Sequence, residues 1–233
     1  MINVQILRLI EGAKKATGLT VIIDVFRAIS LECYLYDMGA KEIRPTGTIE
    51  EAVKMGYRIP GSILAGERAG KKCEGFDLGN SPCSATPEMV ADKIVIHTTS
   101  AGTQGIIHAV HADEIITACL ANARAVAEYI LNKRPETVSL VCMGNMGVQP
   151  AAEDELCAEY IKSIIEGNEL PDMEDRLAYL RYHGGEHFFN PDNQEVFPEQ
   201  DFWLCTKCNI FPFLIRIERD EKGLISRKVM PYE

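Results

Sequence analysis

The first charged residues with chemical potential stand where an apolar, β-branched run ends. Residues 19–25 predict a buried strand, and Asp24 and Arg27 lie at its end. The planar guanidinium of an arginine makes bidentate hydrogen bonds to phosphate or sulfonate. An aspartate at this position can hold a metal ion or a water molecule. The same two residues are equally typical of a helix-capping aspartate and of a structural ion pair.

A second candidate is the glycine-rich loop 66–82. It carries Glu67 and three cationic side chains, Arg68, Lys71 and Lys72, in a chain that is otherwise acidic. Glycines let a backbone approach a ligand closely. Loops this long without secondary structure are usually functional or disordered. The alternative is a mobile charged loop, although apolar residues within it argue against full disorder. Two polar residues near its end, Asn80 and Ser81, are further candidates for substrate binding.

A third candidate is the hydroxyl-rich segment 98–105, which follows a predicted strand and opens a predicted helix. The free N–H groups of a helix start, its positive dipole and nearby hydroxyls can together bind an anion. Ordinary helix capping selects the same residue types, and the segment matches no nucleotide-binding fingerprint. The candidate phosphate-binding residues are Thr98, Thr99, Ser100, Gly102 and Thr103.

Acidic residues cluster at the start of a predicted helix after a glycine-rich loop. Glu153, Asp154 and Glu155 there complement the helix dipole, which is a sufficient structural explanation. Carboxylates beside a phosphate site are also the groups that hold Mg²⁺, with waters and substrate oxygens completing its octahedron. Under this second interpretation, Asp24, Glu153 and Asp154 are candidate metal ligands.

Cysteines and histidines give weaker signals. The chain has eight cysteines, and we expect reduced thiols. Cys205 and Cys208 form a single CxxC without a second ligand pair, so a structural zinc site is not expected. We expect surface or packing roles for four of the histidines, which are His108, His111, His183 and His187.

Composition narrows the class of protein. The 233 residues carry a net charge of −10, which disfavours a nucleic-acid surface but leaves room for a local anion pocket. Apolar stretches are far shorter than the roughly 20 residues of a membrane helix. The first residues lack the order of a signal peptide, so we expect a cytoplasmic protein. The sequence leaves open whether the protein forms a homo-oligomer.

Strand and helix patterns alternate through the first two thirds of the chain. This alternation predicts a three-layer α/β/α fold with a mainly parallel sheet, and residues 213–219 and 224–230 predict a C-terminal β-hairpin. No linker divides the chain, so we expect a single domain over residues 1–233. The predicted strands are 4–9, 19–25, 41–44, 62–65, 93–97, 114–118 and 137–143. The predicted helices are 30–38, 48–55, 103–110, 122–131 and 152–165, and one more begins with Thr86 as its cap and Pro87 at its first position. Helical turns are predicted near 174–180 and 200–208.

Taken together, these segments resemble the 2-phosphosulfolactate phosphatase family. The matching motifs are DVFRA at 24–28, AGER at 65–68, EGFDLGNSP at 74–82, TT and GT at 98–103, and ED with CA at 153–158. Their order and spacing fit over about residues 20–166, and GFDLGNSP after GER is the most specific part.

The resemblance implies a Mg²⁺-dependent phosphatase that cleaves 2-phospho-3-sulfolactate to sulfolactate and phosphate, a step of coenzyme M biosynthesis in methanogens. With this substrate, Arg27, Arg68 and Lys71 would grip anionic groups, and Mg²⁺ would neutralise the phosphoryl oxygens. Glu67 is the candidate general base. Two alternatives are a phosphatase acting on another small phosphorylated hydroxy acid and a non-catalytic anion-binding relative.

The chain departs from the family pattern at several positions. Ile29 stands where the family usually has Thr, and Ala101 where it usually has Asn. In the last third only Asp201 with Cys205 matches, and a His- and aromatic-rich stretch replaces the usual Ser-Gly-Arg segment. If that segment shapes the pocket, the substrate specificity has changed.

Overall fold

A computed structural model describes residues 2–232. Its strands are β1 (Asn3–Arg8), β2 (Gly18–Ile23), β3 (Glu42–Pro45), β4 (Ile63–Arg68), β5 (Lys71–Lys72), β6 (Ile94–Thr98), β7 (Ala112–Ala118), β8 (Thr137–Cys142), β9 (Leu214–Asp220) and β10 (Gly223–Val229). Its α-helices are α1 (Leu9–Ala13), α2 (Ala28–Asp37), α3 (Ile49–Arg58), α4 (Pro87–Val90), α5 (Gly102–His108), α6 (Ala123–Lys133), α7 (Ala152–Ile165), α8 (Met173–Leu180) and α9 (Glu199–Cys205).

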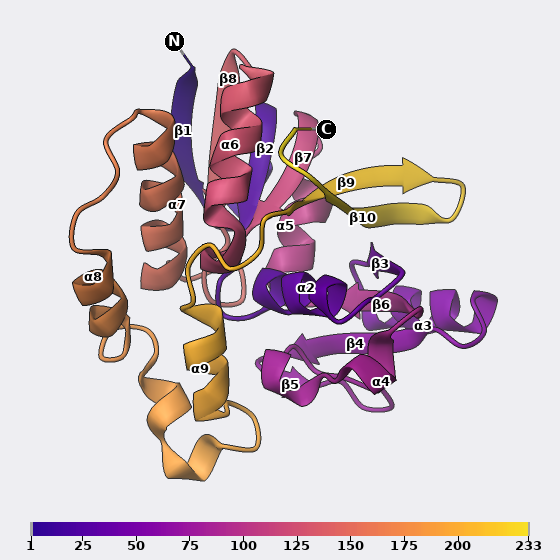
Figure 1. Ribbon diagram of the computed structural model, residues 1–233. Helices are drawn as coiled ribbons and strands as arrows, with labels where there is room; N and C mark the ends of the chain where they lie inside the picture. The colour runs from indigo at the N-terminus through magenta and orange to yellow at the C-terminus, as the bar shows by residue number, and fades with distance from the viewer. Residues whose placement is uncertain (1, 233) are drawn as a thin grey trace.

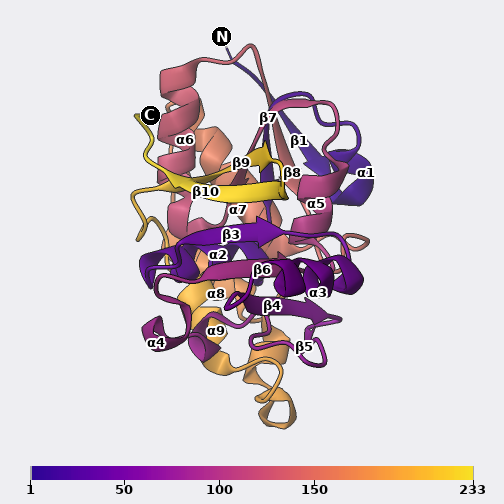
Figure 2. The ribbon, with the colours of Figure 1, turned by 90° about the vertical axis from the view of Figure 1, so that its right-hand side faces the viewer.

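The strands form one sheet in the order β1-β8-β2-β7-β9-β10-β3-β6-β4-β5. Strands β1, β8, β2 and β7 are parallel, as are β3, β6 and β4. The predicted α/β fold with a mainly parallel sheet is therefore confirmed. The predicted hairpin, β9 with β10, lies in the middle of the sheet and joins its two parallel groups. Figures 1 and 2 show how steeply the sheet turns at this junction.

Side chains of alternate strand residues build the core on both faces of the sheet. Leu19, Val21 and Ile23 of β2 belong to the larger apolar cluster. Ile22, between them, packs in a smaller cluster with Ala13 of α1 and residues of α5. Because successive side chains of a strand point to opposite faces, one strand serves both clusters. Helices α2, α6 and α7 cover one face, and α1, α3 and α5 the other (Figures 1 and 2).

Several local predictions hold and some do not. Thr48 and Glu51 form the predicted capping box of α3, with reciprocal side-chain to backbone hydrogen bonds. The first predicted strand ends one residue early, and α1, which follows it, was not predicted. Strand β4 continues to Arg68, so it already contains the start of the loop predicted from residue 66. In the last third, two short 3₁₀ segments, Glu186–Phe189 and Pro191–Asn193, separate α8 from α9.

Within residues 2–232, no helix combines the length and the apolar character that crossing a membrane requires.

Candidate active site

The carboxyl ends of β2 and β8 from one parallel group, and of β4 and β6 from the other, open into one cavity of about 630 Å³. Asp24 lines it from the end of β2, Glu67 from the end of β4, Ser100 from the loop after β6, and Glu153 from the start of α7, which follows β8. Ligands of open α/β sheets bind at this edge. The loops after β2, β4 and β6 therefore meet at one cleft.

Two carboxyl groups of the cavity wall form no ion pair with any of residues 2–232. Asp24 is 5 % exposed and one of its oxygens accepts the N–H of Ala28 at 3.1 Å. Glu153 is 6 % exposed, and its Oε2 has no hydrogen-bond partner among the described residues. Burial raises the pKa of Asp24 to about 6, and the nearby charge of Glu67 adds to this effect. Burial and the charge of Asp24 raise the pKa of Glu153 to about 8.

Asp154 has a different role from the one predicted. Its Oδ1 accepts the N–H of Val25 at 2.8 Å, and its Oδ2 accepts the N–H of Gly144 at 2.7 Å. The carboxylate thus ties the end of β2 to the loop after β8, and it does not line the cavity. In residues 2–232, no three His, Cys, Asp or Glu side chains are grouped closely enough to hold a metal ion. Of the three residues predicted to be metal ligands, Asp24 and Glu153 line the cavity and Asp154 does not.

Glu67 lines the cavity, but its carboxylate is already occupied. Oε1 accepts the backbone N–H of Ser100 at 2.7 Å, and Oε2 accepts the N–H of Gly70 at 2.7 Å. The Ser100 hydroxyl adds a third hydrogen bond at 3.3 Å. Glu67 therefore fixes the loop after β4 against the loop after β6. A carboxylate held in this way is badly placed to accept a proton from water, which weakens its predicted role as general base.

Arg27 is buried and links distant segments of the chain by hydrogen bonds, so most of its guanidinium is not free to bind an anion. Its side chain is 2 % exposed, and Nη1 donates to Asp201 Oδ2 at 2.7 Å and to the Val196 carbonyl at 2.8 Å. Nη2 donates to the Gly70 carbonyl at 3.2 Å. The Phe197 ring lies 4.8 Å from the guanidinium carbon. Arg27 still borders the cavity, and its Nε and one Nη2 hydrogen are not used in these bonds.

Arg68, the second predicted grip, does not line this cavity. Its guanidinium donates to the Glu67 carbonyl at 2.6 Å and to Thr98 Oγ1 at 2.9 Å. Glu67 and Arg68 are consecutive residues of β4, so their side chains leave the strand on opposite sides. The alternation of side chains along a strand is the sequence signal that could have shown that only one of Glu67 and Arg68 faces the cavity.

The hydroxyl-rich segment contributes only part of its predicted donors. Thr99 and Thr103 are fully buried and bond each other: the Thr99 N–H donates to Thr103 Oγ1 at 2.8 Å, and the Thr103 N–H donates to Thr99 Oγ1 at 3.1 Å. These bonds lie at the start of α5, and neither threonine lines this cavity. That they bind substrate stays a prediction. Ser100 does face the cavity. Gly102 lies against Asp24, because a Cβ there would come within 2.9 Å of Asp24 Oδ2.

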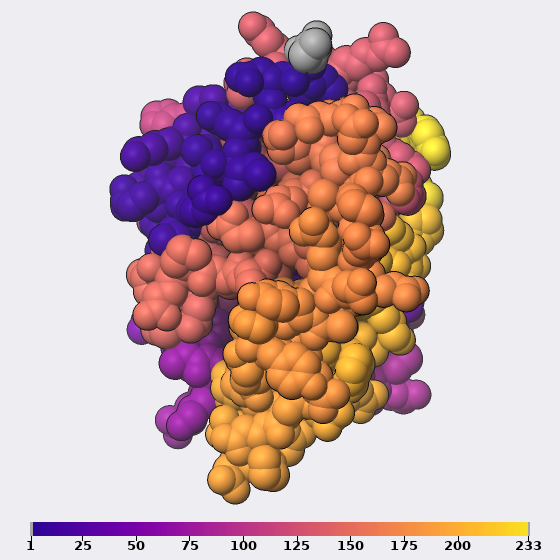
Figure 3. Space-filling model, turned by 90° about the vertical axis from the view of Figure 1, so that its left-hand side faces the viewer, coloured from indigo at the N-terminus to yellow at the C-terminus, as the bar shows by residue number. Residues whose placement is uncertain are grey.

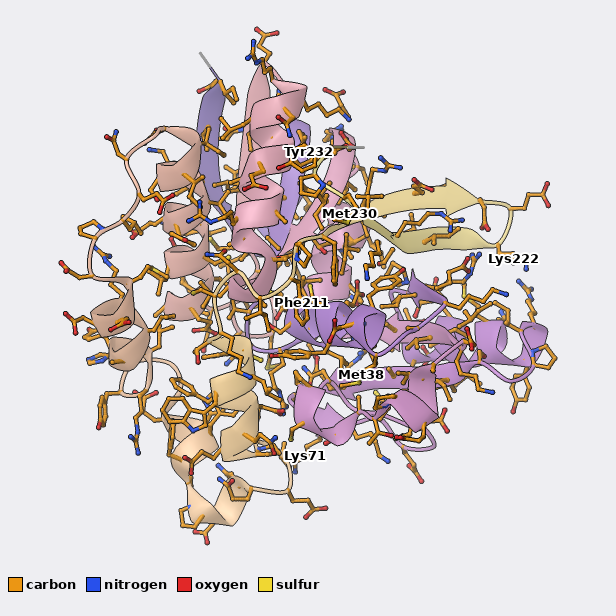
Figure 4. The ribbon with its side chains drawn as sticks, viewed as in Figure 1. Met38, Lys71, Phe211, Lys222, Met230 and Tyr232 are labelled. Carbon is orange, nitrogen blue, oxygen red and sulfur yellow. The ribbon has the colours of Figure 1, made fainter. Side chains whose placement is uncertain are left out.

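A second cavity of about 560 Å³ lies beyond Arg27 and contains the other predicted substrate-binding residues. Lys71 and Ser81 line it, whereas Asn80 borders both cavities, as Arg27 does. Asn80 is 7 % exposed and its Oδ1 has no partner among the described residues. Figure 4 shows Lys71 beside the loop that precedes α9.

The segment between α8 and α9 forms a wall of the first cavity that was not predicted. His183, Gly184, His187 and Phe197 all line the cavity. A Cβ on Gly184 would approach Glu153 Oε2 to 3.0 Å, so a side chain here would crowd that carboxylate. In Figure 3 this orange segment and the salmon loop after β8 occupy the same face of the molecule. Residues 183 and 187 were expected to pack or to face solvent, and no periodic pattern marks them as cavity residues.

Comparison with known proteins decides the family. The family model described as "2-phosphosulpholactate phosphatase" matches residues 5–218. The chain belongs to this family. The match extends beyond residues 20–166, where the motifs carry the resemblance, and reaches residue 218 in the divergent last third. Membership of this family makes the chain a phosphoric monoester hydrolase.

Curated relatives from several bacteria match this member of the phosphosulfolactate phosphatase family. A "Probable 2-phosphosulfolactate phosphatase" of Bacillus subtilis is 29 % identical over 87 % of this chain and 88 % of its own length. A protein of the same description from Caldanaerobacter subterraneus is 42 % identical over 54 % of this chain and 53 % of its own. A third from Thermotoga petrophila is 40 % identical over 65 % of this chain and 64 % of its own.

Proposed function

We propose that this chain hydrolyses 2-phospho-3-sulfolactate to 3-sulfolactate and phosphate with Mg²⁺ bound at Asp24 and Glu153. The relatives' descriptions support the substrate. The observation that carries the metal is the pair of buried, unpaired carboxylates on the cavity wall. Burial keeps Glu153 protonated up to about pH 8, and an ionised pair would repel a phosphate, so the ionised form of this pair needs a cation to accompany the substrate.

The residues of the cavity fit Mg²⁺. This ion prefers oxygen ligands and is usually bound by one or two carboxylates, with waters and substrate phosphate oxygens at the remaining positions. Asp24 and Glu153 supply two such carboxylates on one wall. The orphaned Oε2 of Glu153 also gains a partner if a cation binds there. When bound, Mg²⁺ would neutralise the phosphoryl oxygens and activate water.

The protein itself contributes binding and orientation. Arg27 borders the cavity, where its unused N–H groups can donate to phosphoryl oxygens, whereas the Ser100 hydroxyl already donates to Glu67. The amide of Asn80 reaches the same space from the wall between the two cavities. Lys71, in the second cavity, is placed to attract the sulfonate or carboxylate of the substrate by charge. Phosphoryl transfer depends mostly on such positioning and on charge stabilisation.

Phosphate release from a panel of substrates tests this proposal. We expect Mg²⁺-dependent release from 2-phospho-3-sulfolactate to exceed release from 2-phospholactate, which lacks the sulfonate. Preference for 2-phospholactate would favour a phosphatase for another hydroxy acid. No release from any phosphate ester, with Mg²⁺ or Mn²⁺ present, would contradict the proposal.

A further inference from the structure

The His187 ring occupies a cavity position suited to a base. It lines the same cavity as Asp24 and Glu153. Its ring centroid lies 4.2 Å from that of Phe188 and 4.5 Å from that of Phe197, which holds the imidazole between two aromatic rings. The side chain therefore has a fixed direction relative to the cavity wall.

We propose that His187 is the general base of this phosphatase, the group that takes a proton from the attacking water. This inference rests on the proposed phosphatase activity. Glu67, the alternative base, is less suited to this role, because both of its carboxylate oxygens already accept hydrogen bonds from Ser100 and Gly70.

The surroundings of His187 favour the neutral form of its imidazole. Burial and the positive charge of Arg27 lower its pKa, while the charge of Glu186 and a hydrogen bond to the backbone of Gly184 oppose this. If one ring nitrogen donates its proton to Gly184, the other carries the lone pair. Other ionisable groups of the cavity and its walls are Asp24, Glu67, Glu153, His183 and, behind Arg27, Asp201.

The proton balance of the step is complete without a further reactant. The oxygen of water bonds to phosphorus as the bond between phosphorus and the C2 oxygen of the substrate breaks. His187 takes one proton from that water, and the departing alkoxide takes a proton from solvent. The imidazolium then returns its proton to solvent, so the net reaction is hydrolysis of one ester bond.

Chemical rescue tests the proposal with full-length protein and Mg²⁺. Wild type, H187G and H187Q are compared for phosphate release from 2-phospho-3-sulfolactate, with and without added imidazole. We expect both variants to lose about 10²–10⁴-fold in kcat. Imidazole should restore activity to H187G, where it can enter the space left by the ring, but not to H187Q. At fixed total imidazole, the rescued rate should rise with pH as imidazole loses its proton.

Two further histidine variants are controls. H111G removes an exposed histidine outside the cavity, and its activity should match that of wild type at every imidazole concentration. H183G opens a space in the same wall, and imidazole should not accelerate it. Near-wild-type kcat in H187G, or a folded H187G and H187Q that are slow but insensitive to imidazole, would overturn the assignment of the base. Inactive wild type would instead overturn the proposed function, and the base with it.

Discussion

Two parts of the cavity wall differ in whether their charged side chains have a counter-ion in the folded chain. On the acidic wall, Asp24 and Glu153 are buried without an ion pair among residues 2–232. On the other wall, the charge of Arg27 is balanced by Asp201, whose carboxylate is fully buried. This difference indicates that the acidic wall binds a cation together with the substrate. The charge of Arg27, in contrast, is already balanced by Asp201 in the folded chain. Substitutions on the two walls should therefore separate activity from stability.

The largest expected effect is on turnover. D24N and E153Q keep the shape of each side chain but replace a buried carboxyl group whose ionisation is costly, so the free energy of unfolding of metal-free protein should stay the same or rise. Turnover should fall by about 10²–10³-fold or more, because charge stabilisation of the phosphoryl group is lost. Phosphate release and urea denaturation of the same preparations measure the two effects. If these variants unfold more readily but retain turnover, Asp24 and Glu153 serve stability and not catalysis, which would contradict the proposed difference between the two walls.

The next effect is on stability. D201N leaves the Arg27 guanidinium buried without its counter-ion, and breaking such a pair typically costs about 3–5 kcal/mol. Urea denaturation of D201N should show this loss, whereas D192N, at an exposed position of the same segment, should match wild type. Equal stability of D201N and wild type would mean that Arg27 does not depend on this pair.

A smaller effect is expected on the pH dependence of stability. Glu153 binds its proton up to about pH 8 in the folded chain, while its ordinary pKa is 4.5. The folded state thus holds more protons than the unfolded state between these values, so the stability of metal-free protein should fall as pH rises through this window. The slope should be flatter in E153Q. Identical slopes from pH 5 to 8 for the two proteins would show that Glu153 is ionised throughout.

The smallest effect is expected at Arg68. R68A removes hydrogen bonds to Thr98 and to the Glu67 carbonyl, which should cost about 0.5–1.5 kcal/mol of stability. The KM for the phosphorylated substrate should not change, because Arg68 does not line the cavity. A KM far above that of wild type would return Arg68 to the substrate site.

The fold was largely predictable because its signals are local. Apolar β-branched runs marked the strands, and the Thr48 capping box marked the start of α3. The position of the hairpin was not predictable, since it depends on pairing of β9 with β7 and of β10 with β3, which are far away in the chain.

The site was predictable at the level of strand ends but not of side-chain direction. Asp24, Glu67, Ser100 and Glu153 all reach the cavity. The same residue types also serve structure, as the mutual bonds of Thr99 and Thr103 show, and composition does not distinguish the two roles.

The cavity wall between α8 and α9 was not predicted, because no local sequence pattern indicates it. It is attached through the contact between Arg27 and Asp201, two residues that lie 174 positions apart. Its aromatic and histidine side chains follow neither the helix nor the strand period, so sequence patterns do not show which of them turn toward the cavity.

The central claim is that the acidic wall binds Mg²⁺, and titration calorimetry tests it most directly. Wild type, E153Q and E155Q are each titrated with Mg²⁺ in the presence of inorganic phosphate. Glu155 is the matched control, because it lies in the same helical turn but already pairs with Arg8 at 2.6 Å. We predict that wild type and E155Q bind Mg²⁺ with the same affinity and that E153Q loses this binding. Equal Mg²⁺ affinity in all three proteins, or none in wild type, would contradict the account.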